Sequence, residues 1–324
     1  MAGPLIRRKR VIAAKVEDTP GTAETLTASH AAFNVFDAAI QPITEMEERL
    51  KQASFQRLPA VPGARAGRAT FSLELTAGEI APGWATTFLA GCGLGLVDPA
   101  GGSSGSGSSG SGDSFYQLTN VPPEGSGSRA KTLTIGIWED GLKKQLHGAM
   151  GNAVFTFTAG KKVMIAFDFV GAWDAVADAT ILAPTCPSDL PCRFVSSSFA
   201  IGAWTPKIQQ LTLDLGGEVY LREDSADATG YSSAVIANRN VRGTVNPESG
   251  LEAAYALWAN WLSSTESNLS FNVTDGTNTC AFAAGNFQVM DPQTAERNGV
   301  QVDQIGYELH ADDLNLTFAT GSGS

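Results

Sequence analysis

Hydrophobic and polar residues alternate in short runs along most of the chain, and Gly, Pro, Asn and Asp separate the runs. Phe71, Leu73 and Leu75 occupy every second position of residues 69–75, which is typical of a strand with one buried face. Similar runs predict further strands at residues 132–137, 153–158, 199–201, 209–215, 218–221, 233–236, 300–310 and 314–318. Residues 163–170 are more uniformly apolar, which predicts a strand covered on both faces. The pattern therefore predicts a mainly β fold.

Two segments have helical signals. Residues 82–91 begin with Pro and end with Gly, which are common start and stop signals of a helix. Residues 251–262 place apolar side chains on one stripe of a helix. The residues of that stripe are Leu251, Tyr255, Trp258 and Leu262. We expect each helix to pack its aromatic face on a sheet, and an aromatic cofactor box is the alternative.

The order of predicted elements occurs twice, which suggests an internal repeat. Residues 67–70 and residues 241–244 each lead from a loop toward one of the predicted helices, and Gly-Asn pairs at 151–152 and 285–286 each begin a later strand. A chance match between two β-rich halves is the alternative. We predict a first domain at residues 1–180 and a second at residues 181–324, each a β-sandwich or barrel with one flanking α-helix.

A Gly/Ser-rich segment interrupts the first predicted domain. Residues 101–112 contain nothing but Gly and Ser, so they cannot bury apolar surface and are typical of a flexible coil. We interpret residues 99–113 as a long loop within the domain.

Charge and hydropathy limit the classes of partner. The 324-residue chain has a formal net charge of −11, which disfavours an outer surface that binds nucleic acid but is compatible with a duct through which DNA must slide. No apolar run approaches the roughly 18 residues of a membrane span, and no secretory leader follows the basic start. We therefore expect synthesis in the cytoplasm and no membrane partner.

The sequence contains no recognisable catalytic or metal-binding motif, so we expect no enzyme activity and no cofactor. Asp168 and Asp174 lack the context of a specific acid–base pair. The four cysteines, Cys92, Cys186, Cys192 and Cys280, do not form the two short-spaced pairs of a zinc site. Reduced thiols are expected, and a Cys186–Cys192 disulfide is the alternative.

Several short segments resemble the tail tube proteins of long-tailed bacteriophages (siphophages). They are residues 15–22 (KVEDTPGT), 82–84 (PGW), 89–93 (LAGCG), 230–231 (GY), 238–239 (NR) and 243–248 (GTVNPE). The resemblance implies a virion protein without enzymatic activity whose rings stack into a hollow duct for DNA during genome ejection. It implies partners in further copies of the chain and in the terminator, tape-measure and distal tail proteins, while DNA passes without specific binding. A single-core chain would form hexameric rings, whereas the duplication favours a homotrimer.

The resemblance also implies that long hairpins contact the next ring. Residues 41–67 and residues 221–240 are the candidate hairpins, because both are long, polar and of mixed charge. The candidate contact residues are Glu45, Glu47, Glu48, Arg49, Arg57, Arg222, Glu223 and Arg239.

Two other classes of function compete with a tube subunit. A β-sandwich adhesin or carbohydrate-binding module of a virion would use exposed aromatic side chains near loops. The candidates are Phe115, Tyr116, Trp173 and Trp204. A β-rich hydrolase is the third interpretation, and the absence of a nucleophile motif argues against it.

Overall fold

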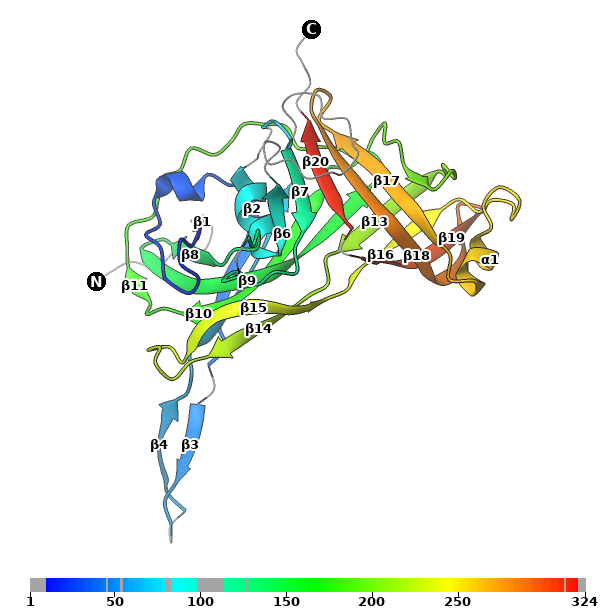
Figure 1. Ribbon diagram of the computed structural model, residues 1–324. Helices are drawn as coiled ribbons and strands as arrows, with labels where there is room; N and C mark the ends of the chain where they lie inside the picture. Colours follow the sequence, from blue (N-terminus) through cyan, green and yellow to red (C-terminus); the bar gives the residue numbers. More distant parts are fainter. Residues whose placement is uncertain are drawn as a thin grey trace.

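The chain is mainly β, as predicted, and its strands are antiparallel (Figure 1). The computed structural model describes residues 10–44, 46–52, 55–79, 83–97, 114–125, 127–311 and 313–319. The Gly/Ser segment 101–112 lies outside these ranges. Helical structure is confined to three short elements of the described chain. They are a 3₁₀-helix η1 (Ala28–Ala31), a π-helix η2 (Ala85–Leu89) and an α-helix α1 (Leu257–Leu262).

Four strands of the first half of the chain form one part of a large sheet. In spatial order they are β2 (Val35–Pro42), β5 (Ala66–Glu74), β10 (Met164–Trp173) and β9 (Leu142–Thr158). Phe71, Leu73 and Leu75 are buried, as their alternation predicts. The prediction that residues 163–170 are covered on both faces is wrong, because Ala166 on the outer face is exposed.

Four strands of the second half continue the same sheet in the same order. They are β13 (Ile208–Asp214), β16 (Val241–Pro247), β19 (Val300–Leu309) and β18 (Thr279–Arg297). The two parts join where residues 154–158 of β9 pair with residues 210–214 of β13. A single ladder of backbone hydrogen bonds therefore crosses from one half of the chain to the other.

Shorter strands complete the sheet on both sides. In the first half, β8 (Leu133–Glu139) lies between β9 and β1 (Arg10–Val16). In the second half, β17 (Glu266–Thr274) lies between β18 and β12 (Ala200–Ile201). β11 (Ala177–Asp178) pairs with β9, as β20 (Asn315–Ala319) pairs with β18. β7 (Ser114–Leu118) joins β20 to β6 (Leu94–Val97), so strands from residues 1–180 extend the sheet of residues 181–324.

Two hairpins leave the sheet at corresponding places. β3 (Met46–Leu50) and β4 (Arg57–Pro62) form the connection from β2 to β5. β14 (Gly217–Glu223) and β15 (Tyr231–Arg239) form the connection from β13 to β16. In Figure 1 the first hairpin projects from the body, whereas the second runs beneath β9 and β10.

The core is continuous between the two halves. Phe157 on β9 packs with its ring centroid 5.0 Å from Phe271 on β17 and 5.2 Å from Phe282 on β18. Phe155 on β9 lies 5.7 Å from Phe282. These rings are almost fully buried, so side chains from both halves share one apolar cluster.

The helix predictions are partly wrong. Phe88 and Leu89 of η2 are buried, in agreement with a helix that packs on the sheet. In the second case the helix spans only Leu257–Leu262, and the expected stripe does not pack, because Leu251 and Leu262 are 80% and 77% exposed. Tyr255 instead stacks on Trp204 at 4.6 Å, a tertiary contact that holds residues 251–256 outside the helix.

Candidate self-association surfaces

The hairpin β3–β4 is the most exposed structure of the described chain. Every residue of its two strands is exposed, including the ion pair between Arg57 and Glu48 at 2.9 Å. Met46 and Leu50 are 57% and 72% exposed, and Phe55 between the strands is fully exposed. An isolated two-stranded hairpin is marginally stable in water, and exposed apolar side chains of this number mark interaction surfaces. Glu47 and Arg49 lie on this hairpin, and Glu45 lies outside the described residues.

The hairpin β14–β15 is docked on the sheet of the first half. Ala234 of β15 is buried against Met150 of β9, with Ala130 in the same cluster. Arg222 forms an ion pair with Glu124, so it is engaged within the chain.

The base of this hairpin is anchored as well. Arg239 donates hydrogen bonds to the carbonyl oxygens of Thr119 at 3.2 Å and of Gly93 at 3.5 Å. Glu223 near the turn is exposed. The structure therefore places the predicted contact residues in two separate groups, one on a projecting hairpin and one on a docked hairpin.

Two glycines allow the docked hairpin to approach closely. Gly21 has a φ of +81°, and a Cβ atom there would lie 2.0 Å from the carbonyl oxygen of Ser232. Gly148 has a φ of +57°, and its Cβ would lie 2.9 Å from the Cα of Ser233. Any side chain at either position would push β15 away from the sheet.

A buried carboxylate holds both glycines in place. Glu17 is 3% exposed and accepts hydrogen bonds from the backbone N–H of Gly21 at 2.8 Å and of Gly148 at 2.7 Å. The hydroxyls of Thr132 and Thr134 donate to the same carboxylate at 2.7 Å and 2.9 Å. The sequence signal for this site is weak, since one Glu in a turn is usually solvated.

We expect Glu17→Gln to lower the free energy of unfolding by about 1–3 kcal/mol, because its NH₂ group faces a backbone N–H that is left without an acceptor. Urea denaturation of the variant and the wild-type chain measures the loss. Glu47→Gln on the exposed hairpin is the matched control, with a change within about 0.5 kcal/mol. Equal stability of the two variants would contradict the anchoring role of Glu17.

Several strands have a single partner strand among the described residues; β1 pairs with β8 alone and β6 with β7 alone. Two further edges matter for association. Side chains reach both: Arg10 donates a hydrogen bond to the carbonyl oxygen of Ala38 on β2 at 2.8 Å, and Trp261 of α1 donates one to that of Met290 on β18 at 3.0 Å. Among the described residues, β2 pairs with β5 alone, and β18 beyond Gln288 pairs with β19 alone. The corresponding part of β9 is covered by β13. Unpaired N–H and C=O groups at such edges are templates for another strand.

Asp168 and Asp174 have different partners. Asp168 forms an ion pair with Arg68, whereas Asp174 accepts a hydrogen bond from His147 at 2.8 Å. That hydrogen bond raises the pKa of His147 above its ordinary value. Within the described ranges, no group of three His, Cys, Asp or Glu side chains is placed to hold a metal ion.

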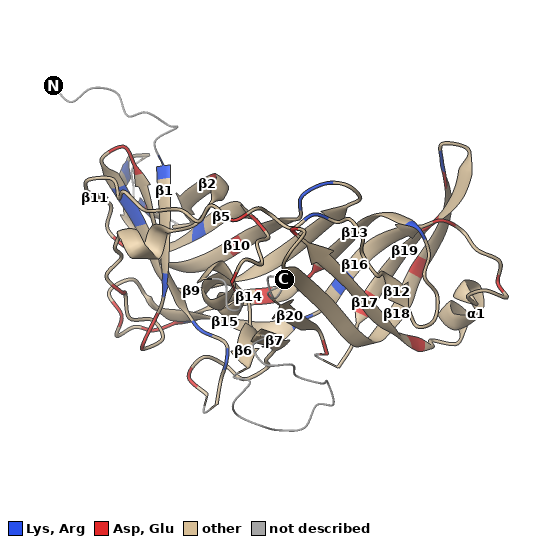
Figure 2. Cartoon of the chain, turned by 90° about the horizontal axis from the view of Figure 1, so that it is seen from above, with Lys and Arg blue, Asp and Glu red and all other residues tan. Residues whose placement is uncertain are grey.

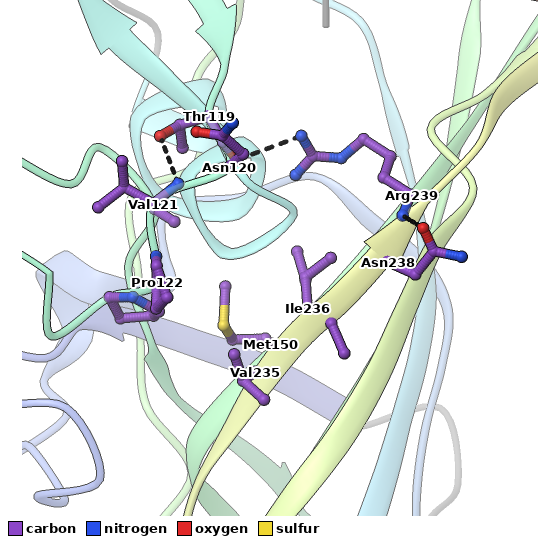
Figure 3. A pocket seen from close by; sticks show the side chains of 12 residues that line it. Thr119, Asn120, Val121, Pro122, Met150, Val235, Ile236, Asn238 and Arg239 are labelled. Atoms are coloured by element: carbon purple, nitrogen blue, oxygen red, sulfur yellow. Dashed lines mark hydrogen bonds between the residues drawn. The ribbon is translucent and has the colours of Figure 1, made fainter.

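A small cavity lies between residues 119–130 and β15 (Figure 3). Its volume is about 230 Å³, below the roughly 300–1,000 Å³ of typical ligand pockets. The side chains around it include Val121, Met150, Ile236 and Arg239. Its mixed polar and apolar lining and its small size indicate no particular ligand.

The four aromatic residues named as adhesin candidates are buried or half-buried. Tyr116 is fully buried, and Trp204 is half-buried in its stack on Tyr255. Phe115 and Trp173 are also half-buried. Alternation along β7 directs Tyr116 into the core, so the prediction of an exposed aromatic side chain is wrong for Tyr116.

The four cysteines are free thiols. Cys186 is exposed, whereas Cys192 is buried, and burial raises the pKa of the Cys192 thiol to about 12. Cys186 is therefore the accessible thiol of the four.

No protein-family model matches the sequence, and no curated protein matches it significantly. None of the helices in the described part of the chain is long and apolar enough to cross a membrane.

Proposed function

We propose that the chain is the structural subunit of a viral tail tube, in which trimeric rings of two-core chains stack into a hollow duct for DNA. The observation that carries this proposal is the joint between β9 and β13. It links two groups of four strands with the same order, β2-β5-β10-β9 and β13-β16-β19-β18, which we call the first and second half-sheets. It leaves β2, and β18 after Met290, without a second partner strand for the same joint with other copies. A head-to-tail contact of this kind closes into a ring when the rotation per copy fits.

A duplicated sequence supports the equivalence of the half-sheets. Residues 57–74 align without a gap to residues 231–248, and six of the eighteen positions are identical. The identical pairs are Ala60 and Ala234, Val61 and Val235, Arg65 and Arg239, Arg68 and Arg242, Thr70 and Thr244, and Glu74 and Glu248.

Residues that lie opposite one another on successive strands form rows across each half-sheet, and corresponding rows can be matched between the two. The row Gln41, Arg68, Val170, Met150 of the first corresponds to Asp214, Arg242, Glu308, Gln288 of the second. The row Phe71, Phe167, Ala153 corresponds to Val245, Ile305, Pro292. Ala153 on β9 therefore corresponds to Pro292 on β18. The next residue on each strand corresponds as well, which pairs Val154 with Gln293.

The equivalence gives the register of the joint between copies. Within the chain, Asp214 lies opposite Val154. The counterparts of these residues are Gln41 and Gln293, so Gln41 of one copy lies opposite Gln293 of the next. Thr294 then lies opposite Ile40.

The proposal also includes passage of DNA, a location in the virion and further partners. The net charge of −11 and the interspersed Lys, Arg, Asp and Glu residues in Figure 2 suit a wall that DNA passes without specific binding. The location would be the virion tail, with terminator, tape-measure and distal tail proteins as the other partners.

Cysteines at the proposed joint provide the test. We expect Gln41→Cys with Gln293→Cys, in a Cys186→Ser background, to form disulfides between chains in concentrated protein, because directly opposed residues of antiparallel strands lie within disulfide distance. Non-reducing gels report the link, and negative-stain electron microscopy reports rings or tubes. The matched control is Val154→Cys with Asp214→Cys, which should link within one chain.

Either of two results would overturn the proposal. One is a dispersed monomer across concentration and salt, with no link between chains while the control link forms. The other is a compact closed dimer, since such a dimer leaves no free edge for a ring.

A further inference from the structure

The two equivalent hairpins lie in different surroundings in the isolated chain. β14–β15 leaves the second half-sheet and lies across β9 and β10 of the first, which is the neighbouring half-sheet (Figure 1). β3–β4 leaves the first half-sheet in the corresponding place and projects from the body. If β3–β4 also lies on the neighbouring half-sheet, that half-sheet belongs to another copy of the chain.

We propose that, in the assembly, β3–β4 of one copy lies across the outer face of β18 and β19 in the adjacent copy of the same ring. This inference rests on the proposed function, because it takes the adjacent copy to be the one whose β18 pairs with β2. The family resemblance implies that this hairpin contacts the next ring. Our proposal instead places the contact within one ring.

The hairpin has the side chains that this position needs. Ala60 is the counterpart of Ala234, which is buried against Met150 within the chain. Met46 is 57% exposed and occupies the position of Val219, a member of the same apolar cluster. These side chains are exposed in the isolated chain and would become buried on the adjacent copy.

The receiving face is open in the isolated chain. A groove of about 290 Å³ is lined by Thr244, Asp291 and Gln304 among others. In the first half-sheet, the counterpart of Asp291 is Asn152, whose side chain accepts a hydrogen bond at 3.1 Å from Gly217 at the base of the docked hairpin. The groove therefore lies where the base of β3–β4 would rest.

Charge is complementary between the two surfaces. Arg49 is exposed on the hairpin, and Arg57 is paired with Glu48. On the two strands that would receive the hairpin, Asp291 lies opposite Gly306 and Glu308 lies opposite Gln288. In the docked hairpin, Arg222 already forms an ion pair with a carboxylate of the neighbouring half, Glu124. The second copy is thus a better occupant than a purely apolar partner.

The test uses Ala60→Cys with Gln288→Cys in a Cys186→Ser background. Gln288 is the counterpart of Met150, so we expect a disulfide or a short bismaleimide link between chains in assembled protein. We expect no link when the protein is diluted to monomers before the oxidant or reagent is added. Ala234→Cys with Met150→Cys is the matched control within one chain. The bismaleimide reagent captures the pair even where the register is offset by a residue.

Three outcomes separate this inference from the proposed function. Links at both Ala60/Gln288 and Gln41/Gln293 support both. A link at Gln41/Gln293 with none at Ala60/Gln288 overturns the position of the hairpin and leaves the joint intact. Failure of both, while the two controls link, overturns the joint and the hairpin position together.

Discussion

Replacing residues 46–62 by an Asn-Gly turn is expected to abolish polymerisation and to leave a folded, soluble chain. The two strands of the hairpin contribute no side chain to the core, because all their residues are exposed. It does carry large apolar side chains, each of which would add about 1.5–3 kcal/mol if fully buried on another copy. Sedimentation velocity and negative-stain electron microscopy measure the loss, and circular dichroism shows that the fold is retained.

A deletion elsewhere controls for the shortened chain. Removing residues 101–112, the Gly/Ser segment, changes the length without removing any apolar side chain. We expect that variant to assemble. Normal tubes from the hairpin replacement would show that β3–β4 plays no part in association.

Phe157→Ala is expected to lower the free energy of unfolding by about 3–5 kcal/mol, the usual range for removal of a buried Phe. The ring is fully buried and contacts Phe194 and Phe271 as well as Phe282. Urea denaturation followed by fluorescence and circular dichroism measures the change. Phe55→Ala on the exposed hairpin is the control, with a change in monomer stability within about 0.5 kcal/mol.

The shape of the transition carries further information. Since Phe157 joins strands of both halves, we expect the two halves of the wild-type chain to unfold in one transition. Two separate transitions, with Phe157→Ala affecting one alone, would show that the halves unfold independently and would contradict the shared core.

Local patterns predict most of the strands but not how they are combined. Alternation at Phe71, Leu73 and Leu75 identifies β5, because burial of one face leaves a period-two signal. The signal at residues 251–262 is misleading, since the stack of Tyr255 on Trp204 outweighs helical periodicity there. The pairing of β7 with β20 joins residues far apart in the sequence, and no local pattern specifies it.

For the candidate surfaces too, local sequence features predict the elements but not how they are placed. Length, polarity and mixed charge are sufficient to locate both hairpins in the sequence. They do not indicate that β14–β15 is docked and β3–β4 is not, because that depends on where the next half-sheet lies. The role of Glu17 is equally hidden, since its four donors come from three separate segments of the chain.

The joint between β9 and β13 lies within one chain, and this has a consequence for the rate of assembly. In a ring of three such chains, every second joint forms during folding, because residues 159–207 connect its two edges and make their pairing an intramolecular event. Only three joints between chains then have to form, whereas a ring of six single-core subunits has six. Closure from dilute protein should therefore be less prone to stall at open, incomplete arcs.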